Sequence, residues 1–301
     1  MHTIDENPNQ TGRDTKRGKR RRRMILLCVL LALAVFIAAE LCASKYALSV
    51  SRYELESEKL SGDIRIVELA DLHNSVFGAD NRRLIETVQK QEPDLICIAG
   101  DLVDSDSQQT DIAVGLIEAL TAIAPVYVSL GNQEVELTET FGTDITALYE
   151  AAGARVLDYA YEEIEVNGQT IRLGGIYGLC TGLKESANEE EYAFVSGMQD
   201  TQLFTLLLCH LPTSWMGPYG ISVWEIDCVL AGHIHGGQII LPGIGGLWAP
   251  DYGFFPSRLD GVFDSDDGRK AVVVTRGLGS TETIPRFHNI PEVLVLDLKP
   301  S

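Results

Sequence analysis

Short apolar segments that end in glycine or acidic residues recur along the chain from residue 61 onward. Continuous or alternating apolar runs predict strands over 63–70, 94–99, 125–130, 203–209, 227–230, 271–275 and 292–298. An Asn-Gly turn at 167–168 predicts a hairpin of 162–166 with 170–173. Apolar residues at helical spacing, looser in the last and acidic segment, predict helices over 80–90, 109–122, 144–152 and 183–200. This alternation predicts a layered α/β domain over 61–301.

The pattern near the N-terminus is different. Residues 24–39 are all apolar, and counting on to Ala43 gives 20 residues with one charge, Glu40. A helix of that length spans about 30 Å, the thickness of a bilayer core. The sequence therefore predicts a transmembrane anchor at 24–43 and a linker at 44–60. The alternative is a signal peptide, although its apolar region would be shorter and would end in a better cleavage site.

Positive charge gathers before this apolar segment. Residues 1–23 hold eight Lys or Arg and three acidic residues, without apolar periodicity, which predicts a disordered polybasic tail. By the positive-inside rule this tail stays in the cytoplasm. We therefore expect a single-pass protein of the cell membrane with its large domain outside the cytoplasm. Under the alternative, the domain would be exported after signal cleavage.

Acidic residues dominate the rest of the chain. The formal net charge is −19, and residues 24–301 alone carry 16 basic and 40 acidic residues, a net −24. Such a body repels nucleic acid and anionic lipid headgroups alike, so nucleic acid is not expected as a partner. The six cysteines show no paired spacing and indicate no disulfide framework.

Polar motifs follow five of the predicted strands, at the point where each strand ends. In open α/β sheets such strand ends meet at one edge, so these side chains are expected to converge. They offer two carboxylates, four imidazoles and one amide oxygen, too many ligands for one tetrahedral ion. The set suits two bridged divalent ions of Mn, Fe or Zn. The motifs are Asp71-x-His73, Gly100-Asp101-x-x-Asp104, Gly131-Asn132, His210 and Gly232-His233-x-His235.

In this order the motifs resemble those of the calcineurin-like metallophosphoesterase superfamily. Later segments, among them Leu241-Pro242-Gly243 and Arg276-Gly277-Leu278-Gly279, extend the resemblance to its bacterial membrane-associated phosphodiesterase branch. The resemblance implies a four-layer αββα sandwich of two mixed β-sheets. It also implies the ligands of two metals bridged by Asp101: Asp71, His73 and His235 for one, and Asn132, His210 and His233 for the other.

The resemblance further implies the reaction. A metal-bridging hydroxide would attack phosphorus in line, and the substrate would be a phosphorylated small molecule or lipid. Because the domain is expected to be tethered, our interpretation is hydrolysis of a phosphodiester or diphosphate bond in an envelope or lipid-linked substrate.

The chain departs from the family pattern at Gln133. Family members usually have a histidine there, which protonates the leaving oxygen or stabilises the transition state, steered by the acid at the position of Asp104. Glutamine cannot transfer a proton, a contribution typically worth ~10²–10⁴-fold in rate. Three interpretations follow: a good leaving group or diphosphate bond; a proton supplied by Glu134 or a metal-bound water; or a catalytically weakened, metal-bound domain that binds phosphorylated ligands.

Other residues near the C-terminus each have two interpretations. His288 is either a structural or rim residue, or a further ligand. Arg276 and Arg286 either contact a substrate phosphate or form ion pairs with the acidic body. An aromatic cluster after His235 either packs a long loop or forms a lip that meets a lipid-like substrate or the membrane surface. Its members are Trp248, Tyr252, Phe254 and Phe255.

Overall fold

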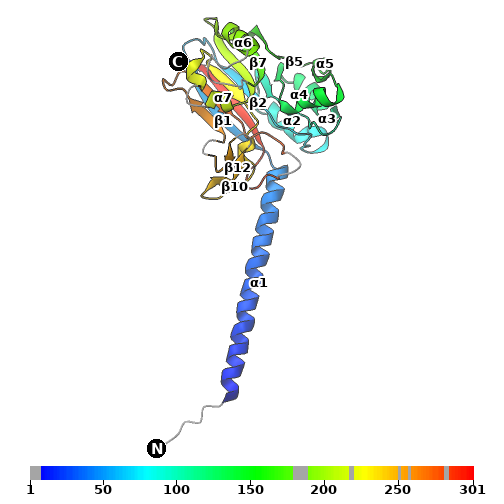
Figure 1. Ribbon diagram of the computed structural model, residues 1–301, viewed down its shortest axis with the longest axis vertical. Coiled ribbons are helices and arrows are strands. Elements are labelled where there is room, and N and C mark those ends of the chain that lie inside the picture. The colour runs from blue at the N-terminus through cyan, green and yellow to red at the C-terminus, as the bar shows by residue number, and fades with distance from the viewer. Residues whose placement is uncertain (1–7, 179–188, 217–219, 250–251, 257–258, 281–284) are drawn as a thin grey trace, which may run out of the picture.

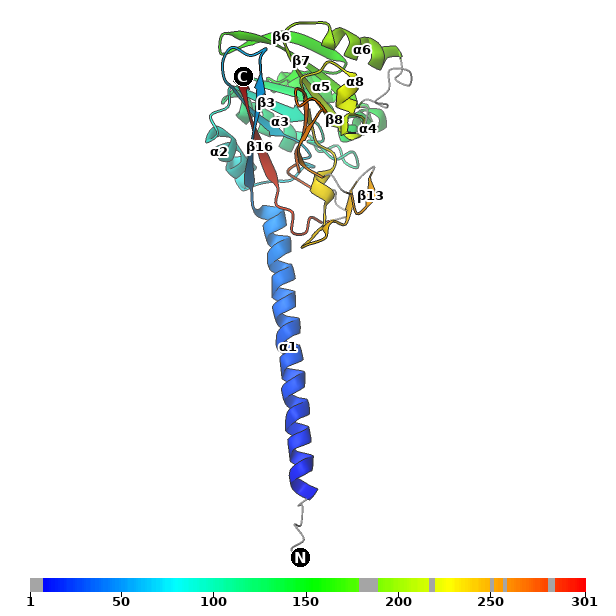
Figure 2. The same cartoon turned by 90° about the vertical axis from the view of Figure 1, so that its left-hand side faces the viewer.

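Two six-stranded β-sheets pack face to face in the computed structural model of the chain, and helices cover their outer faces (Figure 1). One long helix, α1, extends from an end of this domain (Figure 2). The structure describes residues 8–178, 189–216, 220–249, 252–256, 259–280 and 285–301.

The first sheet carries the two acidic motifs at the ends of neighbouring strands. Strands β2 to β5 run parallel, whereas β16 is antiparallel to β2 and parallel to β1. In spatial order the strands are β1 (Ser49–Ser57), β16 (Glu292–Pro300), β2 (Ile64–Leu69), β3 (Leu95–Ala99), β4 (Val126–Ser129) and β5 (Arg155–Val156).

The second sheet carries the histidine motifs. Its four central strands run parallel, and the two edge strands are antiparallel to their neighbours. In spatial order they are β14 (Gly261–Asp264), β15 (Ala271–Val274), β9 (Cys228–Ala231), β8 (Phe204–Leu211), β7 (Gln169–Gly178) and β6 (Ala160–Val166). Both sheets are mixed, as the resemblance implies.

Three apolar clusters fill the spaces between four layers. The first packs α2 (Arg82–Gln89), α3 (Asp111–Thr121), α4 (Asn132–Phe141) and α5 (Ile145–Ala151) on the first sheet. The second lies between the two sheets. The third packs α6 (Glu189–Gln199), α7 (Thr213–Met216) and α8 (Gly220–Val223) on the second sheet. The predicted αββα sandwich is therefore confirmed.

The predicted elements correspond closely to the observed ones, with a few differences. Each predicted strand overlaps an observed strand, and the Asn-Gly turn joins β6 to β7 with both residues at positive φ. The 3-10 helix η1 (Ala79–Asn81) precedes α2. Helix α4 was not predicted and begins directly at Asn132. Of the predicted helix at 183–200, residues 183–188 lie outside the described residues.

Helix α1 (Pro8–Tyr46) is longer than the predicted anchor. Its stretch from Arg17 to Tyr46 is long and apolar enough to cross a membrane, a property that a signal sequence near the N-terminus shares. Residues 8–23 are helical, which differs from the predicted disordered tail. Lys and Arg have high helix propensity, and a helix nucleated by the apolar segment propagates into them at little cost.

The predicted linker at 44–60 is also different, because it is part of the folded domain. Helix α1 ends at Tyr46, and β1 begins at Ser49 and pairs with β16 over its whole length. Side chains of β1 are only partly buried, in alternation, so the strand lacks the continuous apolar run of a central strand. Thus α1 joins the edge of the first sheet without a flexible spacer.

Two short hairpins follow the 3-10 helix η2 (His235–Gly237) and lie beside the domain end of α1 (Figures 1 and 2). The first pairs β10 (Ile240–Leu241) with β11 (Gly245–Gly246). The second pairs β12 (Trp248–Ala249) with β13 (Gly253–Phe254). A parallel bridge between Ile239 and Phe287 ties the hairpins to the segment before β16.

Candidate metal centre

The carboxyl ends of β2 and β3 bring two acidic loops together. Asp71 and Asp101 both have left-handed backbone conformations, with φ of 53° and 54°. The backbone N–H of Asp71 donates to the Gly100 carbonyl at 3.0 Å, and that of His73 donates to the Asp101 carbonyl at 3.1 Å. Backbone hydrogen bonds alone therefore hold the two loops together.

The first group of potential ligands is Asp71, His73 and His235. Their ligand atoms lie within 4.8 Å of one another, and all three residues are buried. A hydrogen bond of 2.8 Å between His73 Nδ1 and Asp104 Oδ1 orients the imidazole. Among the described residues, nothing hydrogen-bonds the buried Nε2 of His73. A buried nitrogen held in this way suits a metal ion, because a carboxylate on the other ring nitrogen is a common support for metal-binding histidines.

The second group of potential ligands is Asp101, His210 and His233, again within 4.8 Å of one another. His210 donates through Nδ1 to the Ala99 carbonyl at 2.7 Å, which turns Nε2 toward the site. The amide oxygen of Asn132 lies 3.1 Å from this Nε2. Every ligand predicted for this metal is therefore present in one place.

Asp101 connects the two groups. Its Oδ2 lies 3.2 Å from His210 Nε2 and 3.7 Å from His73 Nε2. Asp71 in turn accepts hydrogen bonds from the backbone N–H of His233 at 3.0 and 3.1 Å, so the histidine loop is held against the acidic loops. The site combines imidazoles, which suit Zn and Fe, with oxygen donors, which suit Mn.

Glycines permit this close approach of backbone and carboxylates. A Cβ on Gly131 would lie 2.2 Å from Asp101 Oδ1, and one on Gly277 would lie 2.4 Å from Asp71 Oδ2. Gly277 also has φ of 69°, which L side chains rarely adopt. Larger residues at these positions would displace the carboxylates that the site depends on.

The charges of the site compensate one another even without metal. Burial alone would raise the pKa of Asp101, but the imidazole of His210 lowers it to about 2. Burial alone would lower the pKa of His210, but the Asp101 carboxylate raises it to about 9. Without a metal, the Asp101 carboxylate therefore favours a proton on His210. Metal binding must displace that proton, because a ligating imidazole is neutral.

Glu134 lies behind the site and does not face it. Its carboxylate accepts hydrogen bonds from the backbone N–H groups of Asp101 (2.8 Å), Leu102 (2.7 Å) and Gly131 (2.9 Å). The Tyr149 hydroxyl donates to it at 3.0 Å. Glu134 is therefore the clamp that joins the loops after β3 and β4, and both of its carboxylate oxygens are engaged by these donors.

Gln133 lies at the edge of the site, half-buried. Its backbone N–H donates to Asp101 Oδ1 at 2.9 Å, and its amide oxygen accepts from the Ser105 N–H at 2.8 Å. Asp104 does not hydrogen-bond Gln133 and is paired with His73 instead. The acid that the resemblance assigns to steering a catalytic histidine therefore supports a ligand in this chain.

The two arginines and His288 have structural partners. Arg276 forms 3.0 Å ion pairs with Asp260 and Glu292, the second interpretation given to it above. Arg286 is buried and donates to backbone carbonyls, including that of His235, so it positions the histidine loop. His288 contacts Glu40 of α1 at 3.0 Å and lies outside both ligand groups.

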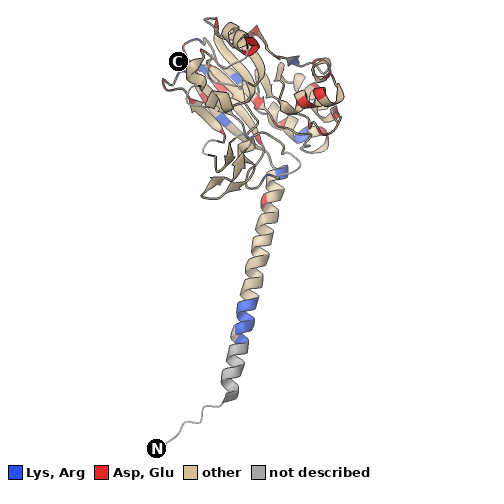
Figure 3. Cartoon of the chain, in the orientation of Figure 1, with Lys and Arg blue, Asp and Glu red and all other residues tan. Residues whose placement is uncertain are grey.

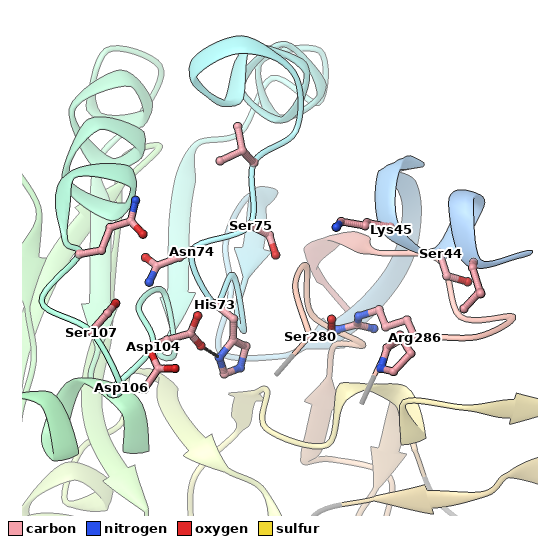
Figure 4. A pocket seen from close by; sticks show the side chains of 14 residues that line it. Ser44, Lys45, His73, Asn74, Ser75, Asp104, Asp106, Ser107, Ser280 and Arg286 are labelled. Atoms are coloured by element: carbon pink, nitrogen blue, oxygen red, sulfur yellow. Dashed lines mark hydrogen bonds and ion pairs between the residues drawn. The ribbon is translucent and has the colours of Figure 1, made fainter. Parts of the chain in front are cut away.

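A cavity of about 980 Å³ opens above the first ligand group. His73 and Asp104 lie on one side of it, and Ser44 and Lys45 of α1 lie on the other (Figure 4). Lys45 points into the cavity and comes from the last turn of α1. The sequence alone does not mark Lys45 as a site residue, because a lysine after an apolar helix is ordinarily a mark of the membrane interface.

The comparisons with known proteins agree with this geometry. Residues 64–237, more than half of the chain, match the model of the calcineurin-like phosphoesterase family. The chain therefore belongs to that family, and it is a metal-dependent phosphoric ester hydrolase.

Two bacterial relatives cover most of the chain. It is 29% identical over 241 residues to the metallophosphoesterase YkuE of Bacillus subtilis, covering 78% of this chain and 79% of YkuE. It is 28% identical over 238 residues to the phosphodiesterase YaeI of Escherichia coli, covering 78% and 82%. A dimetal phosphatase structure from Danio rerio aligns with a TM-score of 0.43 at 13% identity, covering 72% of this chain and 88% of that one.

The clamp formed by Glu134 gives a first prediction. Glu134→Gln keeps the size of the side chain but turns a donor toward backbone N–H groups. We expect a loss of roughly 2–4 kcal/mol in unfolding free energy and weaker Mn²⁺ binding, measured by thermal unfolding with and without the metal. The exposed Glu139→Gln on the same helix should change stability by less than about 0.5 kcal/mol. Equal stability of the two variants would contradict the clamp.

Proposed function

We propose that the chain is a two-metal phosphoesterase. Two divalent ions of Mn, Fe or Zn would be held by the predicted ligands and would polarise a phosphoryl oxygen and lower the pKa of a water nucleophile. Asp71, His73 and His235 would hold one ion, and Asn132, His210 and His233 the other, with Asp101 shared. The observation that carries this proposal is the buried Asp101 carboxylate between His73 and His210.

The residues around the ligands favour a substrate with a good leaving group. Gln133 cannot give a proton, and the Glu134 carboxylate is engaged with three N–H groups and a hydroxyl. A leaving oxygen of low basicity, as in an activated phosphodiester or a diphosphate, needs no protein acid. The alternative is a weakened domain that binds phosphorylated ligands, and its one supporting observation is Gln133 itself.

The proposed substrate is linked to a lipid or to another component of the cell envelope. Support comes from the cavity, whose wall includes Leu41, Ser44 and Lys45 of α1. If α1 is retained as a membrane anchor, with its basic end in the cytoplasm, the domain lies outside and the cavity opens next to the bilayer surface. Lys45 would then meet the phosphate of a membrane-bound substrate.

The shared ligand gives the test of the proposed function. The full-length protein, purified in detergent and loaded with Mn²⁺, should hydrolyse bis(p-nitrophenyl) phosphate or a soluble diphosphate. Asp101→Asn should reduce turnover to background and bound metal well below that of the wild type, since both ions share this ligand. Asp111→Asn, at the exposed start of α3, should change neither. Metal bound without any turnover would favour the binding alternative.

The substitution at position 133 gives a third prediction. Gln133→His restores a group that can transfer a proton, so it should raise hydrolysis of an alkyl phosphodiester by ~10²-fold. The p-nitrophenyl ester, whose leaving group needs no proton, serves as the internal control and should change little. An unchanged rate on the alkyl ester would show that Gln133 does not limit the reaction.

Lys45 gives a fourth prediction. Lys45→Gln should raise KM about tenfold, equivalent to roughly 1.4 kcal/mol, for a prenyl diphosphate presented in vesicles. Lys45→Arg keeps the charge and should recover most of the loss. The exposed Lys90→Gln, directly after α2, removes the same charge outside the cavity. Equal effects of Lys45→Gln and Lys90→Gln would contradict a contact of Lys45 with the substrate.

A further inference from the structure

The hairpin pair β10 to β13 is a region of very low charge on a strongly acidic protein. Residues 238–256 contain one charged residue, Asp251, whereas charged residues make up 22% of the chain. Three large apolar side chains project from it: Ile244 is 69% exposed, Phe254 72% and Phe255 61%. Neither blue nor red marks the described part of these hairpins (Figure 3). The metal centre and its cavity do not use these side chains.

Backbone hydrogen bonds connect the two hairpins to each other and to the segment before β16. Ile240 N–H donates to the Phe287 carbonyl at 2.9 Å, and Leu247 N–H donates to the Ile239 carbonyl at 2.8 Å. The N–H of Phe255 then donates to the Leu247 carbonyl at 3.0 Å. The exposed side chains are therefore held in place relative to Phe287.

Phe287 packs directly against the apolar part of α1. Its ring meets the ring of Phe36 edge to face, with centroids 6.5 Å apart. His288 and Asn289 contact Glu40 and Ser44 of the same helix at 3.0 and 3.2 Å. Phe36 precedes Ala43 by seven residues, about 10 Å along the helix axis. The hairpins therefore lie beside the apolar part of α1, and not only beside the polar residues at its domain end.

We propose that these hairpins insert into the lipid leaflet beside α1 and form a second membrane contact of the domain. Their apolar side chains are exposed, as are those of α1, and the hairpins lie beside the domain end of that helix, so one apolar phase can cover both (Figures 1 and 2). With Asp251 as its one charged residue, the region repels lipid headgroups far less than the acidic body does. The same hairpins contain Trp248 and Tyr252, the residue types that are enriched at membrane interfaces.

The second contact would fix how the domain sits on the bilayer. One helix alone permits rotation and tilt, whereas two separate contacts define a plane. The cavity wall at Leu41 and Lys45 would then face the headgroups beside the hairpins. This inference rests on the proposed retention of α1 in the membrane and does not depend on catalytic turnover.

Tryptophan fluorescence in the full-length protein tests the inference. Trp215 and Trp224 are fully buried in the domain, and Trp248 lies in the hairpins. In a Trp248→Phe background, Phe254→Trp places a probe on β13. The protein is reconstituted in phosphatidylcholine vesicles with or without bromine on the acyl chains. Bromine quenches tryptophan on contact, so we expect a loss of the emission contributed by position 254.

Two matched probes make the result decisive. Phe36→Trp in α1 should be quenched, and Phe141→Trp, an exposed position on α4, should not. Quenching at 36 but not at 254 would overturn the hairpin contact and leave the anchor intact. Quenching at neither position would overturn both the hairpin contact and the membrane anchor. Emission at 254 that changes with protein concentration but not with bromine would indicate a second copy of the chain as the partner, and would also overturn the inference.

A second measurement separates this inference from the proposed enzyme activity. The triple variant Ile244→Glu, Phe254→Glu and Phe255→Glu should lose bromolipid contact and hydrolyse a vesicle-borne diphosphate several-fold more slowly. Its hydrolysis of soluble bis(p-nitrophenyl) phosphate should equal that of the wild type. An equal loss on both substrates would point to misfolding or to a catalytic effect and would contradict a membrane role.

Discussion

One buried carboxylate, that of Asp101, has to reach imidazoles supplied by both sheets. His73 follows β2 of the first sheet, and His210 belongs to β8 of the second. Such a charge is tolerated only where opposite charges or N–H donors surround it. The absence of a side chain at Gly131, the clamp of Glu134 and the parallel strand ends that meet at one edge all serve this single requirement. The two-sheet sandwich therefore holds the two oxygens of the Asp101 carboxylate in place.

Much of the fold and all of the ligand groups could be predicted because their signals are local. Central strands are continuous apolar runs, and their polar termini are read directly from the residues that follow. The convergence of Asp71 and Asp101 follows from the rule that the ends of neighbouring parallel strands share an edge. His210 lies on the second sheet, so it meets them only because the two sheets pack face to face.

The features that could not be predicted depend on partners far away in the sequence. β1 pairs with β16, some 240 residues later, and its own strand signal is only the short alternation from Tyr53 to Glu56, within an otherwise polar segment that resembles a linker. The role of Glu134 depends on backbone donors in the loop after β3, which sequence spacing does not reveal. Arg276 finds Asp260 and Glu292 only once β15 and β16 are folded. Long-range pairing, and not residue type, decides each of these cases.

The junction between α1 and β1 has a consequence for which substrates can be reached. Only Ala47 and Leu48 separate the helix from the strand. If α1 is retained as a membrane anchor, as proposed, two residues would keep the cavity at a nearly constant height above the bilayer, whereas a long linker would let the domain sweep a wide volume. Such an enzyme would select substrates by the distance of their phosphate from the membrane surface. A phosphate next to the lipid of a lipid-linked molecule would be within reach, and the same group farther out along a polymer would not.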